Sequence, residues 1–458
     1  MTLLTAFLLS GCNAVFSEAE EPEISKNAEI ALDENNKQPD NDATEPSDEE
    51  ESSLIEINED IFRKPKEEKP PTKVESSSLD TSKASKNNEI IGLWLAYLDY
   101  VNLLQDKSEA EAKKSINNAF EQIKNDGFNT IFIQIRPFSD AIYPSDMYPW
   151  SHILNKDSIQ GKNPGYDPLA LMVSIAKEKD LKVHGWINPY RISLLNHPKA
   201  FADDNILNNT SMSEKDFISL GSSSFINPAS EYGRQYVVDG IKEILENYSL
   251  DGIQFDDYFY PSQDEGIDKE YYSEYLSSGG TLALADYRRE NVNLLVKQVY
   301  SEIKNINSSI IFGISPDANI ERNYTQHYAD VSKWIKEDGY LDYIMPQIYF
   351  GFNHVSLGYD DTVKAWNSLT SGTNKSLMIG IGVYKIGLED EWAGEDGKFE
   401  WIENGSLIAE QYENAKTASQ YGGVCLFRYD VIYNPDSWQK AQVEKELDAF
   451  KEAVNKYR

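Results

Sequence analysis

Residues 130–190 begin with TIFIQIRP (130–137) and end with KVHGWINPY (182–190), and a helical pattern covers 168–179 between them. Each flanking run is short, almost continuously apolar and rich in β-branched residues, which is typical of parallel strands buried on both faces. Asp167 and Pro168 favour a helix start, as N-cap and first-turn proline. These residues therefore predict a βαβ unit.

The same alternation continues on both sides of this unit. Six more apolar runs lie at 91–98, 252–260, 310–317, 342–350, 377–384 and 423–430. Further helical patterns lie at 111–126, 231–247, 283–306, 326–338, 359–370, 406–420 and 437–456. Eight such units predict an α/β fold, a (β/α)8 TIM barrel with enlarged βα loops. A doubly wound sheet is the alternative, but no glycine-rich phosphate fingerprint follows the first run.

A segment of different composition precedes the barrel. Residues 18–88 hold 21 Asp and Glu, 9 Lys and Arg, and Phe62 as their only aromatic residue. Because so little apolar surface cannot offset the entropy of ordering the chain, we expect this segment to be disordered. The expected organisation is a signal at 1–12, a disordered acidic linker at 13–88 and the barrel domain at 89–458.

The first twelve residues, MTLLTAFLLSGC, resemble a bacterial lipoprotein signal. The apolar run is too short to cross a bilayer as a helix, and it ends in a small residue followed by Cys12. We therefore expect lipidation of Cys12 and anchoring at the extracytoplasmic face of the cell membrane. No Lys or Arg precedes the run, which a start codon upstream of Met1 would explain.

Composition excludes several classes of function. A formal net charge of −33 would repel a phosphate backbone, so nucleic-acid binding is not expected. Two cysteines exclude a disulfide scaffold, and five histidines without a metal-binding spacing predict no metal centre. No cofactor is expected either. His184 lies inside an apolar run, where a core histidine is favoured over a catalytic one.

Polar and aromatic side chains gather where the predicted strands end. In a TIM barrel these ends form the catalytic face, so side chains there are candidates for chemistry. Aromatic rings stack on sugar faces, and amides and guanidinium groups bind hydroxyls, so this composition favours a polysaccharide substrate. The candidates for substrate binding are Arg136, Asn188, Arg191, Tyr258, Tyr260, Gln347, Tyr349, Tyr384 and Arg428.

The clearest catalytic signal is the adjacent pair Asp256 and Asp257 in the run 252–260. Neighbouring carboxylates cannot both ionise freely, so a neutral acid can stand beside an ionised base, as glycoside cleavage requires. Strand alternation places Asp256 toward the barrel lumen, as the carboxylate that stabilises or attacks the anomeric carbon. The proton donor is Asp257 or Asp140. Arg136 is expected to pair with one carboxylate.

Several long motifs resemble the glycosyl hydrolase-like 10 family. They are GFNTIFIQIRPFSDAIYPSDMYPWS (127–151), GYDPLALMVSIAKEKDLKVHGWINPYR (165–191) and INPASEYGRQYVVDGIKEILENYSLDGIQFDDYFYP (226–261). The resemblance covers almost the whole expected domain and implies a bacterial cell-surface barrel protein. It also implies glycosidase activity on peptidoglycan strands stripped of their stem peptides, with Asp140, Asp256 and Asp257 as the family acids.

The chain departs from the family pattern after the fifth run. There it reads GISPDANIERN (313–323), whereas the family usually carries an aromatic–glycine pair after the proline, so the resemblance does not support Asp317 as a site residue. The leading interpretation is a glycoside hydrolase acting on peptide-free cell-wall glycan. The alternatives are a glycosidase of another surface or biofilm polysaccharide and a non-catalytic, glycan-binding surface lipoprotein.

Overall fold

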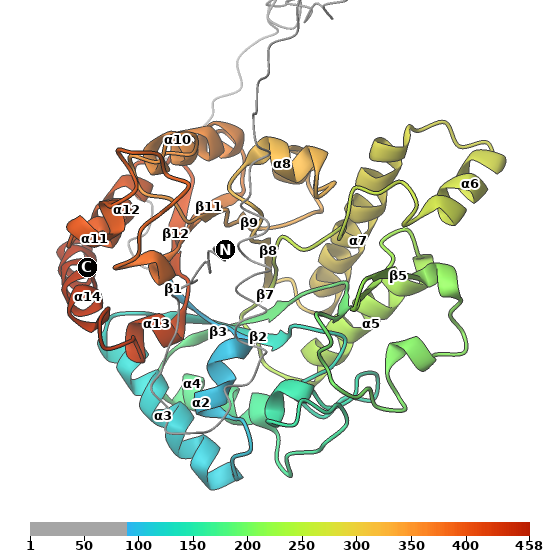
Figure 1. The fold of residues 1–458 in the computed structure, drawn as a ribbon, viewed down its shortest axis with the longest axis horizontal. Coiled ribbons are helices and arrows are strands. Elements are labelled where there is room, and N and C mark those ends of the chain that lie inside the picture. Colours follow the sequence, from blue (N-terminus) through green and yellow to red (C-terminus); the bar gives the residue numbers. More distant parts are fainter. Residues whose placement is uncertain (1–88) are drawn as a thin grey trace, which may run out of the picture. The chain divides into compact units, whose positions relative to one another are not determined.

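The computed structural model describes residues 89–458, and the expected signal and linker lie outside the described residues. A ring of parallel strands closes into a barrel because the last strand pairs with the first (Figure 1). The ring contains β1 (Ile90–Leu95), β2 (Thr130–Arg136), β3 (Lys182–Ile187), β7 (Gly252–Phe255), β8 (Ile311–Ile314), the split pair β9 (Tyr343–Ile344) and β10 (Gln347–Ile348), β11 (Ser376–Ile381) and β12 (Tyr421–Leu426). The predicted (β/α)8 TIM barrel is confirmed.

Helices surround this ring, as Figure 1 shows. Those that follow the strands at the predicted places are α3 (Glu109–Asn125), α4 (Pro168–Glu178), α5 (Glu231–Asn247), α7 (Leu284–Ile306), α9 (Val331–Lys336), α10 (Tyr359–Thr370), α12 (Leu407–Ala415) and α14 (Lys440–Tyr457). Short helices lie in the connections: α2 (Tyr100–Leu103), α8 (Ile320–Thr325), α11 (Glu400–Glu403) and α13 (Tyr429–Tyr433). Asp167 caps α4 by accepting from the amide of Ala170 at 2.9 Å.

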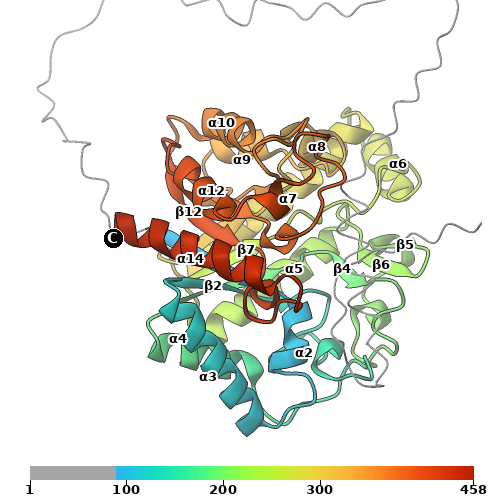
Figure 2. The same cartoon turned by 60° about the vertical axis from the view of Figure 1, so that its left-hand side comes forward.

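Two insertions in the βα loops lie beside the barrel (Figure 2). The connection from β3 to α5 forms an antiparallel sheet of β4 (Arg191–Ser193), β5 (Phe217–Leu220) and β6 (Ser223–Ile226). The connection from β7 to α7 contains α6 (Lys269–Ser277). Lys215 pairs with Glu274 at 2.6 Å and therefore joins the two insertions. The sequence predicted enlarged loops but not this second sheet.

Side chains from facing strands fill the barrel. Trp94 on β1 donates its indole N–H to Gln254 on β7 at 2.7 Å. His184 on β3 contacts the Tyr343 hydroxyl on β9 at 3.2 Å, and burial lowers the pKa of His184 to about 3. His184 is therefore a neutral core residue, as its apolar run suggested. Among residues 89–458, no helix has the length and apolar character needed to cross a bilayer.

Candidate active site

Asp256 follows β7 at the C-terminal end of the barrel, and only 3% of it is exposed. Its carboxylate accepts hydrogen bonds from the indole of Trp186 at 3.0 Å and from the amide of Asn188 at 3.3 Å. Both donors come from β3 or the turn that follows it, so the neighbouring strand holds this carboxylate. Burial raises the pKa of Asp256 to about 7, although the nearby Arg191 guanidinium acts to lower it.

Asp257 has its partners on the other side, at the ends of β8 and β10. Its Oδ1 accepts from the Gln347 amide at 3.1 Å. Burial raises the pKa of Asp257; His327 opposes that rise, and Asp317 adds to it. Arg322 donates to Asp317 at 2.6 and 2.8 Å, and such contacts hold the pKa of Asp317 below its usual value despite burial. The ionised Asp317 therefore favours retention of the proton by Asp257.

Aromatic rings gather at the ends of β10, β11 and β12. Tyr349 stacks on Phe427 with ring centroids 5.5 Å apart, and Tyr384 meets both rings edge-on. Trp186, which binds Asp256, also contacts Phe427 at 6.4 Å. The cluster is thus continuous with the carboxylate site, and its half-buried member, Tyr384, can offer an apolar ring face to a sugar.

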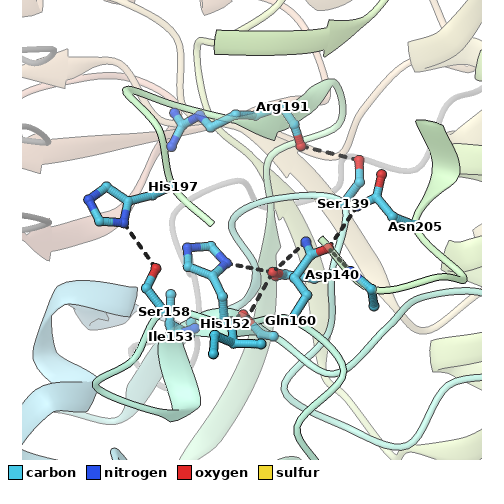
Figure 3. A network of polar contacts seen from close by, with 12 residues as sticks. Ser139, Asp140, His152, Ile153, Ser158, Gln160, Arg191, His197 and Asn205 are labelled. Atoms are coloured by element: carbon cyan, nitrogen blue, oxygen red, sulfur yellow. Dashed lines mark hydrogen bonds and ion pairs between the residues drawn. The ribbon is translucent and has the colours of Figure 1, made fainter. Parts of the chain in front are cut away.

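Asp140 lies in a separate polar network in the loop after β2 (Figure 3). Its Oδ2 contacts the His152 Nδ1 at 2.6 Å and accepts from the Gln160 amide at 3.1 Å. Burial opposes its ionisation, yet His152 and Gln160 help to hold the pKa of Asp140 below its usual value. A fully buried, ionised carboxylate is a poor proton donor, so this geometry favours Asp257 for that role.

Arg136 points away from the carboxylate pair. Its guanidinium lies over the Tyr148 ring at 4.2 Å, and a Cβ added to Gly240 on α5 would overlap it. The side chain is therefore between the barrel and α5, among tyrosines rather than beside Asp256 or Asp140. A register shift in the β2–β3 pairing lies just before Arg136 and breaks the strand alternation there.

Two other candidates also have their own partners. Tyr260 packs edge-on against Tyr328 at 5.2 Å and faces Arg288, so it belongs to the packing against α7. The Arg428 Nε lies 3.6 Å from Asp99 Oδ1, at the junction of β12 and β1. Burial raises the pKa of Asp99 to about 7 although Arg428 opposes the rise. These contacts place Tyr260 against α7 and Arg428 beside Asp99.

Two histidines that the sequence analysis did not select lie close to the candidate acids. His152 binds Asp140, and His327 lies 3.7 Å from Asp317 and acts on Asp257. Neither histidine has a motif spacing to its acid, so only the loop conformations reveal the pairs. No cluster of three or more His, Cys, Asp or Glu side chains suited to a metal ion occurs within residues 89–458.

Comparison with known proteins identifies the family to which this chain belongs. The model of the family glycosyl hydrolase-like 10 matches residues 89–394. The chain belongs to this family. Membership in the glycosyl hydrolase-like 10 family confirms the resemblance in the motifs, and with it the predicted enzyme class, a glycoside hydrolase.

Two glycosyl hydrolases align with most of this chain. The glycosyl hydrolase DigH of Escherichia coli (strain K12) is 31% identical over 83% of this chain and 90% of its own. The glycosyl hydrolase YngK of Bacillus subtilis (strain 168) is 34% identical over 66% of this chain and 62% of its own. DigH therefore aligns over nearly its full length.

Solved structures resemble the fold at low sequence identity. The PgaB (BpsB) glycoside hydrolase domain from Bordetella bronchiseptica superposes with a TM-score of 0.52 at 10% identity, covering 79% of this chain and 98% of that one. The catalytic domain of β-amylase from Paenibacillus polymyxa gives 0.51 at 11% identity, covering 80% and 98%. These likenesses concern the barrel alone.

Proposed function

We propose that this glycosyl hydrolase-like 10 protein cleaves the glycan strands of the bacterial cell wall after their stem peptides have been removed, with Asp256 and Asp257 as its catalytic residues. The observation that carries the proposal is the pair of buried carboxyl groups after β7, both with raised pKa values, next to an aromatic cluster. Family membership supports the reaction class. The cell-wall substrate rests on the resemblance of the motifs.

In the proposed reaction Asp257 gives its proton to the glycosidic oxygen as the bond to the anomeric carbon breaks. Asp256, held by Trp186 and Asn188, acts in its ionised form and stabilises or attacks the positively charged anomeric carbon. Water then supplies the new hydroxyl group, and its released proton returns to a carboxylate of the pair. Each turnover therefore restores the starting state, with one proton for two carboxyl groups.

The other site residues are proposed to bind the sugar units. Asn188 and Gln347 each hold one carboxylate and so lie within reach of the substrate's polar groups. Tyr349 and Tyr384 present rings on which pyranose faces can stack. These contacts orient the scissile bond and use binding energy to position it.

Incubation with peptide-free glycan strands, followed by mass analysis of the products, tests the substrate. We expect shortened strands from the wild-type protein and intact strands with Asp256→Asn. Unaltered glycan with the wild-type protein, together with cleavage of another surface polysaccharide, would overturn the cell-wall assignment. Binding without cleavage of any glycan would indicate the non-catalytic alternative.

The location of the enzyme is also a proposal. We propose that Cys12 is lipidated and that the acidic residues that follow connect the barrel to the membrane surface, because MTLLTAFLLSGC resembles a lipoprotein signal. An enzyme anchored in this way would reach glycan strands close to the extracytoplasmic face of the membrane.

A further inference from the structure

A buried carboxylate–histidine pair stands next to the site without belonging to it. Asp140 and His152 are both fully buried and meet at 2.6 Å through Oδ2 and Nδ1. Because a carboxylate can only accept, the histidine Nδ1 carries the hydrogen. The backbone N–H of His152 and the Gln160 amide donate to the same oxygen. Burying a charge is costly unless it is paired and hydrogen-bonded, and these contacts meet that requirement for Asp140.

The two residues before Asp140 both contact Arg191. Ser139 donates its hydroxyl hydrogen to the Arg191 carbonyl at 3.2 Å, a contact visible in Figure 3. The Phe138 ring lies 5.4 Å from the Arg191 guanidinium and packs edge-on against the His152 ring at 4.8 Å. The loop that Asp140 and His152 hold is therefore in contact with both the backbone and the side chain of Arg191.

Arg191 in turn acts on the catalytic pair. Its guanidinium lies over the Tyr258 ring at 4.4 Å, and its positive charge favours the ionised form of Asp256. Arg191 and Asp257 are the charged groups that act on Asp256, while its donors from β3, Trp186 and Asn188, are neutral. Any displacement of Arg191 should therefore change the pKa of Asp256 more than it changes the position of its carboxylate.

We propose that the Asp140–His152 pair is a positioning unit that fixes the Phe138–Ser139 turn and thereby holds the Arg191 guanidinium over the ring of Tyr258, whose backbone N–H donates to Asp256 at 3.4 Å. The proposal rests on the proposed function, in which Asp256 is the central carboxylate. It assigns His152 and Asp140 an indirect role, because neither touches the reacting carboxylates through its side-chain contacts.

The test is a titration that needs no turnover. Trp186 donates its indole N–H to Asp256, so the indole resonance of ¹⁵N-tryptophan-labelled full-length protein reports the protonation of that carboxyl. Trp186→Phe assigns the resonance. We expect Arg191→Met to raise the titration midpoint by about one pH unit, as loss of a nearby cation does. His152→Ala should raise it by about half as much, and His152→Gln, which keeps a donor, should largely restore it.

A double substitution separates positioning from general loosening. If His152 acts through Arg191, His152→Ala should add no further shift in the Arg191→Met background. Ser158→Ala is the matched control, because it removes another buried contact of the same loop, the one to His197 at 2.9 Å, without touching the Asp140 group. It should lower the melting temperature and leave the midpoint in place.

Three results would overturn the proposal: an unchanged midpoint in folded His152→Ala, an equal shift in the Arg191→Met background, or the same shift with Ser158→Ala. Should His152→Ala fail to fold, Asp140→Asn takes its place and is also expected to raise the titration midpoint. An unchanged midpoint in Asp140→Asn would overturn the proposal as well. Because the resonance titrates whether or not glycan is cleaved, failure of the proposed function would appear separately, as absence of products.

Discussion

Asp256 and Asp257 are neighbours in sequence with different surroundings. Asp256 accepts hydrogen bonds from neutral donors of β3 and the turn that follows it, which suit a carboxylate that must carry charge during the reaction. Asp257 accepts from Gln347 and lies near an ionised Asp317, which favours its neutral form. Pairs of acids whose environments differ in this way can divide the roles of base and acid.

We expect Asp256→Asn to reduce kcat by about 10³-fold or more and to leave glycan affinity nearly unchanged, because the amide keeps the shape and removes the charge. The rate at which shortened glycan appears gives kcat, and calorimetry with the intact glycan gives Kd. Asp251→Asn is the matched control from the other end of β7, where Asp251 accepts from the Val183 amide at 2.9 Å. A comparable loss of kcat in that control would argue against a special role for Asp256.

The pH dependence should identify the proton donor. Asp256 must be ionised and Asp257 protonated for the reaction, and both pKa values are raised, so kcat/KM should rise as Asp256 loses its proton at about pH 7 and fall as the pH passes through the raised pKa of Asp257. Asp257→Asn should lose natural substrate activity but cleave an aryl glycoside with a good leaving group, without the alkaline limb. Persistence of that limb in the variant would assign the proton to another group.

At the scale of elements, the strands bring large side chains together inside the barrel by leaving space at glycines. A Cβ at Gly313 on β8 would overlap the ring of Tyr343 on β9, and a Cβ at Gly252 on β7 would overlap the ring of His184 on β3. These glycines therefore permit the His184–Tyr343 contact across the lumen. Close packing in the barrel layer below the site therefore depends on small residues as much as on large ones.

Gly313→Ala should destabilise the barrel by about 1–3 kcal/mol, because the added methyl group must displace a packed tyrosine ring. Urea unfolding followed by fluorescence measures the change. The companion variant Gly313→Ala with Tyr343→Leu should recover part of the loss, since the smaller side chain makes room. If the single variant were as stable as the wild type, the close approach at Gly313 would be wrong.

At the scale of the whole molecule, the barrel and the residues before it differ in composition. Residues 89–458 contain the complete ring of strands and the candidate site. Residues 18–88 carry 21 acids and a single aromatic side chain, a composition that offers little apolar surface to a core. The barrel is therefore expected to provide the stability and activity of the protein. The N-terminal residues are expected to determine where the protein lies in the cell.

A chain that begins at Asn87 should keep the melting temperature of the full-length protein, because the removed residues hold little apolar surface to bury. Differential scanning calorimetry of the two chains makes the comparison. A melting point lower by several degrees would mean that the removed segment packs on the barrel.

Cys12→Ser should move the protein from the membrane fraction to the soluble fraction without changing its rate of glycan cleavage, because it removes the expected site of lipidation alone. Fractionation of cells and an assay of each fraction provide the measurement. Retention of the full-length variant in the membrane would point to another means of anchoring.

Local patterns in the chain were sufficient to predict the barrel, because each buried strand and each amphipathic helix carries its own periodicity. The adjacent acids after β7 were also evident, since residues next to each other in sequence remain neighbours in any fold. Only the tertiary structure decided that Arg136 faces α5 instead of pairing with one of the candidate carboxylates, because a register shift just before it in β2 interrupts the strand alternation. It likewise decided that His152 binds Asp140 and that Asp317 lies near Asp257, since loop conformation brings these pairs together and no sequence period encodes it.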